Sequence, residues 1–193
     1  MLEARPHGRD PGPLLEAALR GGVDVVQLRD KELPERELVA AAEPFRGACA
    51  AADALFVLND RPDLVEACGA EGVHVGRSDV PVADARSVVG AERLVGLSAS
   101  TAGELNDVEG ADYVGVTAFS TPTKEDAVVG GLDLVRRAAR TLTIPWFAIG
   151  GIDRSNVSQL VAAGAPGIAV VRAIRDADDP TAAARELRTA FPD

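Results

Sequence analysis

Short apolar segments alternate with longer segments of helical character along the chain, and this alternation constrains the fold more than any other feature. The apolar runs lie at residues 23–28, 55–58, 72–75, 94–97, 113–116, 146–149 and 168–171. They are continuous in apolar character, as in strands covered on both faces. The helical segments are rich in Ala, Leu, Arg and Glu and lie at residues 13–20, 35–52, 62–68, 82–89, 132–141, 155–163 and 180–190. Strands that alternate with helices predict a single α/β domain, residues 1–193, with a parallel sheet and right-handed crossovers.

A doubly wound sheet and a (β/α)₈ TIM barrel both contain this alternation. The strands recur at short and fairly even spacing, and no Gly-x-Gly-x-x-Gly motif follows the first one, which favours the barrel. Only seven strands are visible, because the chain opens with a polar stretch and then the helix at residues 13–20. We therefore expect a (β/α)₈ barrel that lacks most or all of its first strand. Either residues 1–3 contribute a stub or that strand is absent.

Charge and cysteine content narrow the classes of partner. The 193 residues contain 20 Lys and Arg against 30 Asp and Glu, a net charge of −10. This balance argues against nucleic acid or an anionic membrane as a partner, whereas a small phosphorylated ligand needs only a few local cations. No run approaches the roughly 20 apolar residues of a membrane span, and no signal peptide is recognisable. Cys49 and Cys68 lie in helical segments, are expected to be buried, and suit a reducing cytoplasm.

Three residues predict local features of the helices. Pro44 lies inside the helical segment 35–52, where its ring and missing N–H predict a kink or a break. Gly69 and Gly164 stand where the C-terminal caps of two helices belong.

The carboxyl ends of barrel strands carry the functional residues of this fold. Gln27, Arg29 and Lys31 follow the first visible strand with one parity, which predicts that they share a face and form an anion cradle. Asp60 and Asp79 end two neighbouring strands, so their carboxylates can converge on Mg²⁺, a cation that prefers one or two carboxylates plus substrate phosphates. The alternative is that each Asp caps a helix.

Other strand ends carry weaker signals. His74 lies inside a strand and is expected to be a core or supporting histidine. Ser98 begins a group of small hydroxyl residues, and residues 117–124 form a hydroxyl-rich loop ending in Lys124, typical of a phosphate-binding lid.

A second anion site is predicted after the last two strands. Gly151 follows one strand and permits close backbone approach to a ligand, while the amides of Val171 and Arg172 open a short helix after the other. These loops form the common phosphate site of the barrel. Two anion sites at one barrel mouth suit a transferase that joins two phosphorylated substrates.

Five motifs together resemble the thiamine-phosphate synthase family, in its order and spacing over nearly the whole chain. They are Gln-Leu-Arg-Asp-Lys at residues 27–31, Leu-Asn-Asp-Arg at 58–61, Val-His-Val-Gly at 73–76, Thr-Pro-Thr-Lys at 121–124 and Ala-Ile-Gly-Gly-Ile at 148–152. The resemblance implies a TIM barrel that couples hydroxymethylpyrimidine diphosphate to a thiazole phosphate or its carboxylated form. The products are thiamine phosphate and diphosphate, with CO₂ from the carboxylated substrate.

The resemblance also implies a role for individual residues. Arg29, Lys31, Ser98 and Lys124 are the expected catalytic residues, and Asp60 and Asp79 the expected Mg²⁺ ligands. The expected substrate-binding residues are Gln27, Leu28, Arg29, Asp30, Lys31, Asn59, Ser98, Thr121, Pro122, Thr123, Lys124, Gly151, Val171 and Arg172. Within this set the thiazole phosphate is held by Thr121, Thr123 and the amides of Gly151, Val171 and Arg172.

The chain departs from the family pattern at several positions. The family's usual first strand, which ends in a Thr-Asp-like pair, is missing. Residues 3–6 resemble the sequence that follows that strand in the family, so the first residue of this chain can be internal to a longer protein. Arg77 stands where the family usually has Gln, which predicts a perturbed metal site or an additional cation. Thr117 and Ala118 replace a common Gly-Pro, and Arg172 replaces a small residue.

Two other functions fit the sequence less well. A thiazole tautomerase of the same superfamily needs an acid–base histidine near Phe119, and no histidine follows His74. A non-catalytic phosphate-binding relic, disabled by the missing strand, is the second alternative.

Overall fold

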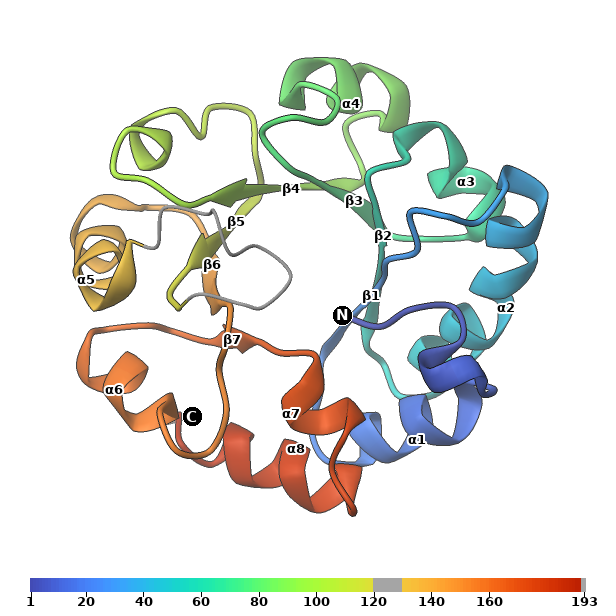
Figure 1. The fold of residues 1–193 in the computed structure, drawn as a ribbon. Helices are drawn as coiled ribbons and strands as arrows, with labels where there is room; N and C mark the ends of the chain where they lie inside the picture. The colour runs from blue at the N-terminus through green and yellow to red at the C-terminus, as the bar shows by residue number, and fades with distance from the viewer. Residues whose placement is uncertain (120–129, 192–193) are drawn as a thin grey trace.

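Seven parallel strands form one curled sheet with the helices outside it in the computed structural model of the chain, which describes residues 1–119 and 130–191 (Figure 1). The strands are β1 (Val25–Leu28), β2 (Leu55–Asn59), β3 (Gly72–Val75), β4 (Leu94–Ala99), β5 (Tyr113–Thr117), β6 (Trp146–Ile149) and β7 (Ile168–Ala169). Each strand pairs with the next one in sequence, in the order β1-β2-β3-β4-β5-β6-β7. All seven predicted strands are present, and the predicted barrel-type α/β fold is confirmed.

Helices link consecutive strands and cover the outside of the sheet (Figure 1). They are α1 (Gly12–Arg20), α2 (Glu35–Ala51), α3 (Val65–Cys68), α4 (Val82–Val89), α5 (Gly131–Thr141), α6 (Val157–Ala162), α7 (Arg172–Arg175) and α8 (Pro180–Arg188), with 3₁₀ turns η1 (Pro6–Gly8), η2 (Pro62–Leu64) and η3 (Glu104–Asn106). Helix α2 continues through Pro44, so no break occurs there. Gly69 and Gly164 adopt left-handed backbone angles, φ 66° and 91°, just after α3 and α6, as expected of residues that end helices.

The hydrophobic core lies between the sheet and the helices. Leu28 and Phe56, from β1 and β2, are fully buried against Leu38 and Phe45 of α2. The rings of Phe45 and Phe56 lie 5.9 Å apart, a usual separation for packed aromatic side chains. The two cysteines are buried and unbridged, as expected. Because one face of each strand is used in this packing, the other face is left to line the barrel interior.

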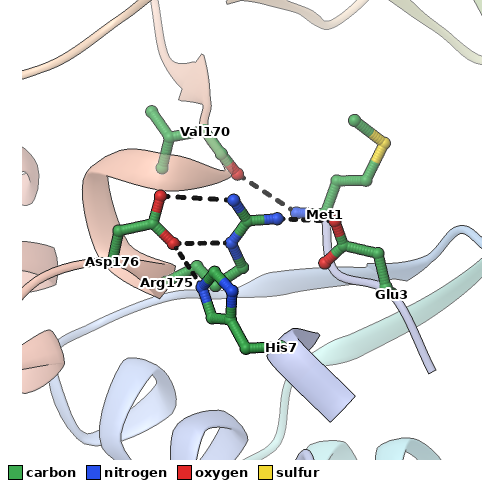
Figure 2. Close-up of polar contacts among 6 residues, drawn as sticks. All are labelled: Met1, Glu3, His7, Val170, Arg175 and Asp176. Carbon is green, nitrogen blue, oxygen red and sulfur yellow. Dashed lines mark hydrogen bonds and ion pairs between the residues drawn. The ribbon is translucent and has the colours of Figure 1, made fainter. Parts of the chain in front are cut away.

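The first strand position is filled by a stub at the start of the chain. Leu2 pairs in parallel with Leu28, donating its N–H to the Gln27 carbonyl at 2.8 Å and accepting from Arg29 N–H at 2.9 Å. On the other side, the nitrogen of Met1 donates to the carbonyl of Val170 at 3.2 Å (Figure 2). Residues 1–3 therefore bridge β1 and the end of β7, which confirms the stub alternative.

Charged side chains attach this stub to α7 (Figure 2). The guanidinium of Arg175 donates to Glu3 Oε1 at 2.6 Å and, through Nε and Nη2, to both carboxylate oxygens of Asp176 at 2.7 and 3.2 Å. His7 Nε2 lies 2.9 Å from Asp176 Oδ1. Hydrogen bonds from Arg175 and His7 lower the pKa of Asp176 to about 2, so its carboxylate is ionised at neutral pH. The cluster couples the residues that close the ring to the turn after β7.

Replacing Arg175 by methionine is expected to lower the free energy of unfolding by about 1–3 kcal/mol, since it removes the described hydrogen-bonding partner of Glu3 and leaves Asp176 with His7 alone. Only 16% of the Arg175 side chain is exposed. Urea unfolding monitored by circular dichroism measures the change. Arg172→Met removes the same charge from the exposed start of α7 and serves as the control. Equal stability of the two variants would contradict a closing role for Arg175.

Candidate functional site

Side chains at the end of β1 alternate between the two faces of the sheet. Leu28 is fully buried in the core, so only its backbone is available to a ligand. Gln27 and Arg29 are half-buried and share the opposite parity, toward the barrel interior. Lys31 lies beyond the strand and is more exposed. The half-buried state of Gln27 and Arg29 is compatible with the predicted common face, which stays a prediction for Gln27, Arg29 and Lys31.

Lys31, Asp60 and Asp79 come together from the ends of three neighbouring strands. The Nζ atom of Lys31 lies 2.8 Å from Asp60 Oδ2 and 3.7 Å from Asp79 Oδ1. Both carboxylates are largely shielded from solvent, with 19% and 24% of their side chains exposed. The predicted convergence of Asp60 and Asp79 is confirmed, and an ammonium group already lies against both carboxylates.

Neither Asp60 nor Asp79 caps a helix, and the local backbone conformation fixes the positions of both carboxylates. Asp60 adopts a left-handed conformation with φ 64°, which is uncommon for a residue with a side chain and costs about 1 kcal/mol or more. Asp79 Oδ2 accepts a hydrogen bond from Gly76 N–H at 2.9 Å. The caps of η2 and α4 are instead Arg61 and Pro81, neither with a side-chain cap bond. The helix-cap alternative is therefore wrong for both aspartates.

The two carboxyl groups titrate as a pair. Burial and the neighbouring Asp79 raise the pKa of Asp60, although Lys31 opposes the rise. Burial acts to raise the pKa of Asp79 as well, but hydrogen bonds from Asp60, the Gly76 backbone and Lys31 outweigh it and leave that pKa lowered. The pair therefore carries concentrated negative charge that a further cation would relieve.

A small cavity of about 160 Å³ adjoins this cluster. Its lining includes Asp30, Lys31, Leu33, Leu38, Asn59, Asp60 and Arg61. A larger cavity of about 410 Å³ lies between residues 105–111 and 141–144, which precede β5 and β6 and so belong to the opposite end of the sheet. Because catalytic groups of this fold lie at the carboxyl ends of strands, the smaller cavity is the candidate site.

Polar side chains inside the barrel form a connected set. His74 of β3 lies between two partners, with Nδ1 3.1 Å from the Tyr113 hydroxyl and Nε2 2.9 Å from Ser98 Oγ. Burial lowers the pKa of His74 to about 4, so the ring is neutral at pH 7. Burial also raises the pKa of Tyr113, to which Gln27 is hydrogen-bonded. His74 is thus a supporting histidine, as predicted. The sequence analysis missed Tyr113, although it is the only tyrosine and lies in a predicted strand.

The second expected anion site is only partly described. Gly150 has φ 102° and lies so close to Phe119 that an added Cβ would be 2.5 Å from the Phe119 carbonyl oxygen, which explains the need for glycine. The carbonyl of Gly151 accepts from Asn156 Nδ2 at 2.8 Å, fixing the turn after β6. Val171 and Arg172 begin α7, as expected. Thr121, Pro122, Thr123 and Lys124 lie outside the described residues.

The contacts of Arg77 differ from those expected of an additional cation at the metal site. Its guanidinium contacts Ser98, Glu104 and Asp107, on the side of the loop that follows β4. It forms no described ion pair with Asp60 or Asp79. The predicted perturbation of the metal site by Arg77 is therefore not supported by these contacts.

The proposed metal site would have only two protein carboxylates. Among residues 1–119 and 130–191, no cluster of three or more His, Cys, Asp or Glu side chains is arranged to hold a metal ion. A two-carboxylate site fits a metal that takes its remaining ligands from substrate and water, as Mg²⁺ does. Within the same residues, no helix has the length and apolar character needed to span a lipid bilayer.

Comparison with known proteins identifies relatives over most of the chain. A model of the family described as thiamine monophosphate synthase matches residues 3–174. A thiamine-phosphate synthase from Thermobifida fusca is 46% identical over 192 residues, covering 96% of this chain and 88% of that protein. Another from Nostoc sp. strain PCC 7120 is 44% identical over 172 residues, covering 88% of this chain but 49% of that protein. The chain thus spans about half the length of several curated relatives that it matches.

Solved structures agree with this assignment. A thiamine phosphate pyrophosphorylase from Pyrococcus furiosus superimposes with a TM-score of 0.85 at 35% identity, covering 92% of this chain and 87% of that one. A 3-hexulose-6-phosphate synthase superimposes with a TM-score of 0.70 at 19% identity, a likeness of fold alone.

Proposed function

Because the chain belongs to the thiamine monophosphate synthase family, we propose that it condenses a pyrimidine diphosphate with a thiazole phosphate. The products are thiamine phosphate and diphosphate, with CO₂ when the thiazole carries a carboxyl group. The observation that carries the proposal is the meeting of Asp60, Asp79 and Lys31 at one strand edge, beside the Arg29 and Gln27 face. This arrangement provides both the cations and the metal-binding carboxylates that a departing diphosphate requires.

The expected residues divide between the two ends of the first substrate. Arg29, Lys31 and Asn59, with Lys124, bind the diphosphate, while Gln27 and Ser98 face the pyrimidine ring. The positive side chains stabilise the charge that grows on the leaving oxygen as the carbon–oxygen bond breaks. The thiazole nitrogen then attacks the pyrimidine methylene carbon. Positioning of the two substrates supplies much of the remaining rate enhancement, and no protein nucleophile is needed.

Asp60 and Asp79 are proposed to hold Mg²⁺. When bound, the ion would neutralise diphosphate oxygens and so lower the barrier to their departure. The two carboxylates fit this role because they already share one cation, and because burial, together with the neighbouring Asp79, raises the pKa of Asp60. Diphosphate oxygens and water would supply the ligands that the protein does not.

The second phosphate is proposed to bind across the loops after β6 and β7. The amides of Gly151, Val171 and Arg172 would donate to its oxygens, and Thr121 and Thr123 would add hydroxyl donors. The ion cluster of Glu3, Arg175 and Asp176 supports this turn, because Arg175 ends the helix that Val171 and Arg172 begin.

The test is production of thiamine phosphate from the two phosphorylated substrates, measured with Mg²⁺ and with EDTA. Turnover that requires Mg²⁺ and releases one diphosphate per thiamine phosphate is the expected result. Binding of both substrates without turnover would instead favour the non-catalytic relic. Conversion of one thiazole isomer to another would indicate the tautomerase. Among the residues that the structure describes, His74 gives the tautomerase no support, since both of its ring nitrogens already have partners.

Lys31 is expected to compete with the metal before substrate arrives. The ammonium group lies against both carboxylates, so Lys31→Met should bind Mn²⁺, a probe for Mg²⁺, about five- to tenfold more tightly in the absence of diphosphate. Isothermal titration calorimetry measures this affinity. The control is Arg29→Met, which removes a charge from the same strand end without a described ion pair to either Asp60 or Asp79. Equal Mn²⁺ affinities for the two variants would contradict the competition.

A further inference from the structure

Arg77 makes four hydrogen bonds that the proposed reaction does not account for. Its Nε donates to the carbonyl of Ser98 at 3.2 Å, and its Nη2 donates to the carbonyls of Glu104 and Asp107 at 2.6 and 2.7 Å. Its Nη1 donates to the Asp107 carboxylate at 2.9 Å. Three of the four acceptors are backbone carbonyls, and only 28% of the Arg77 side chain is exposed. The side chain is therefore built into the structure.

The loop that Arg77 contacts connects β4 to β5. Among the connections that join β1 to β7, the one between β4 and β5 is the only one for which no α-helix is described, and it contains just the 3₁₀ turn η3. Within η3 the Glu104 carbonyl already accepts a hydrogen bond from the Asp107 N–H at 3.2 Å. Arg77 supplies donors to the carbonyls of Glu104, at the start of η3, and Asp107, just after it. Arg77 lies two residues after β3, so its hydrogen bonds attach this loop to the end of a neighbouring strand.

Contacts continue from this loop along the rim of the barrel. The Glu104 carboxylate accepts from Ser100 N–H at 2.5 Å, and Ser100 Oγ lies 2.9 Å from Thr117 Oγ1 at the end of β5. Arg77 therefore stabilises a set of contacts that extends from β3 to β5. A substitution of Arg77 is therefore expected to alter the positions of the Ser100 and Thr117 hydroxyl groups.

Ser98 connects Arg77 with the polar residues inside the barrel, because Arg77 contacts its backbone and His74 contacts its side chain. Arg77 fixes its backbone through the carbonyl, while His74 Nε2 contacts its side-chain hydroxyl at 2.9 Å. Arg77 thus holds the Ser98 backbone from which the side chain projects, and His74 holds the hydroxyl itself. No described contact links Ser98 to Lys31, Asp60 or Asp79, so this serine belongs to a different end of the site from the anion-binding cluster.

We propose that Arg77 is a positioning residue that fixes Ser98, and so sets the affinity of the site for the pyrimidine end of the diphosphate substrate. This inference rests on the proposed function, in which Ser98 faces the pyrimidine. It differs from a general role in stability, because it predicts that recognition of the ring suffers while recognition of the diphosphate does not. It also explains why Arg77, a charged residue close to the proposed metal ligands, contacts neither Asp60 nor Asp79.

The test compares two ligands that share a diphosphate but differ in the pyrimidine. Isothermal titration calorimetry with Mg²⁺ measures Kd for the pyrimidine diphosphate and for inorganic diphosphate. Arg77→Ala is expected to weaken the first about tenfold and to change the second less than twofold. In turnover, KM for the pyrimidine diphosphate should rise while KM for the thiazole phosphate is unchanged. Arg77→Lys keeps the charge and one contact, so it should give an intermediate loss and serves if the alanine variant folds poorly.

Asp107→Asn is the matched control, because it removes the exposed ion pair while the backbone contacts of Arg77 remain. This variant should bind both ligands as the wild type does. Equal losses of both ligands in the Arg77 variants, or no loss of either, would overturn the inference while wild-type binding leaves the proposed function intact. Wild-type protein that binds neither ligand would overturn the proposed function and this inference with it.

Discussion

Asp60→Asn is expected to lower Mg²⁺-dependent synthesis of thiamine phosphate by about a thousandfold or more, since it removes one of only two protein ligands proposed for the metal. Asparagine has the same shape and tolerates the left-handed backbone found at Asp60. The fold should therefore survive, and the free energy of unfolding should be unchanged or slightly higher, because burial and the neighbouring Asp79 raise the pKa of Asp60 and so disfavour its charged form. Initial rates measured with saturating substrates and Mg²⁺ test the first part, and urea unfolding tests the second.

Asp63→Asn provides the control for Asp60→Asn. Asp63 lies three residues further along the chain and pairs with Arg61 at the surface, with 54% of its side chain exposed. Its replacement should leave the rate within a few-fold of the wild-type value. An Asp60→Asn enzyme with wild-type rates would reject Asp60 as a metal ligand.

The stability of the folded chain is expected to fall by about 3 kcal/mol as the pH drops from 6.5 to 4, because of His74. Burial lowers the pKa of this histidine from its usual value of 6.5 to about 4. Between those values the unfolded chain takes up a proton that the folded protein does not, so acid favours unfolding. The contribution is complete above pH 6.5 and is lost as the pH falls toward 4. Free energies of unfolding in urea at several pH values measure it.

His74→Asn separates this effect from the titration of carboxylates. The variant should be less stable than wild type at pH 7.5, and the difference should shrink as the pH falls, since asparagine does not titrate. A difference between wild type and His74→Asn that stays constant with pH would contradict a neutral, buried His74.

The strand positions and much of the site could be predicted because they follow from local patterns. Continuous apolar runs identify strands that are covered on both faces, and parallel pairing then brings their carboxyl ends to one edge. This reasoning located Asp60 and Asp79 together without any knowledge of their distance. It also placed Gln27 and Arg29 on a common face, because parity along a strand is a geometric property.

Other features depend on contacts between distant residues, which no local pattern contains. Arg77 was expected near the metal because of its position in sequence, but its long side chain reaches acceptors 21 to 30 residues away. The link between Tyr113 and His74 spans 39 residues. The helix through Pro44 shows that packing can override a local signal for a break. The stub at residues 1–3 is too short to be recognised as a strand from its own sequence.

The central claim is that Asp60 and Asp79 form a magnesium site for a departing diphosphate. Crystals of the protein grown with Mn²⁺ and inorganic diphosphate test it most directly, through the anomalous scattering of the metal. The account predicts a manganese peak coordinated by both carboxylates, with diphosphate oxygens completing its shell and the Lys31 ammonium moved from the carboxylates to the diphosphate. Diphosphate bound at this strand edge with no manganese peak against Asp60 and Asp79, or a peak at another place, would contradict it.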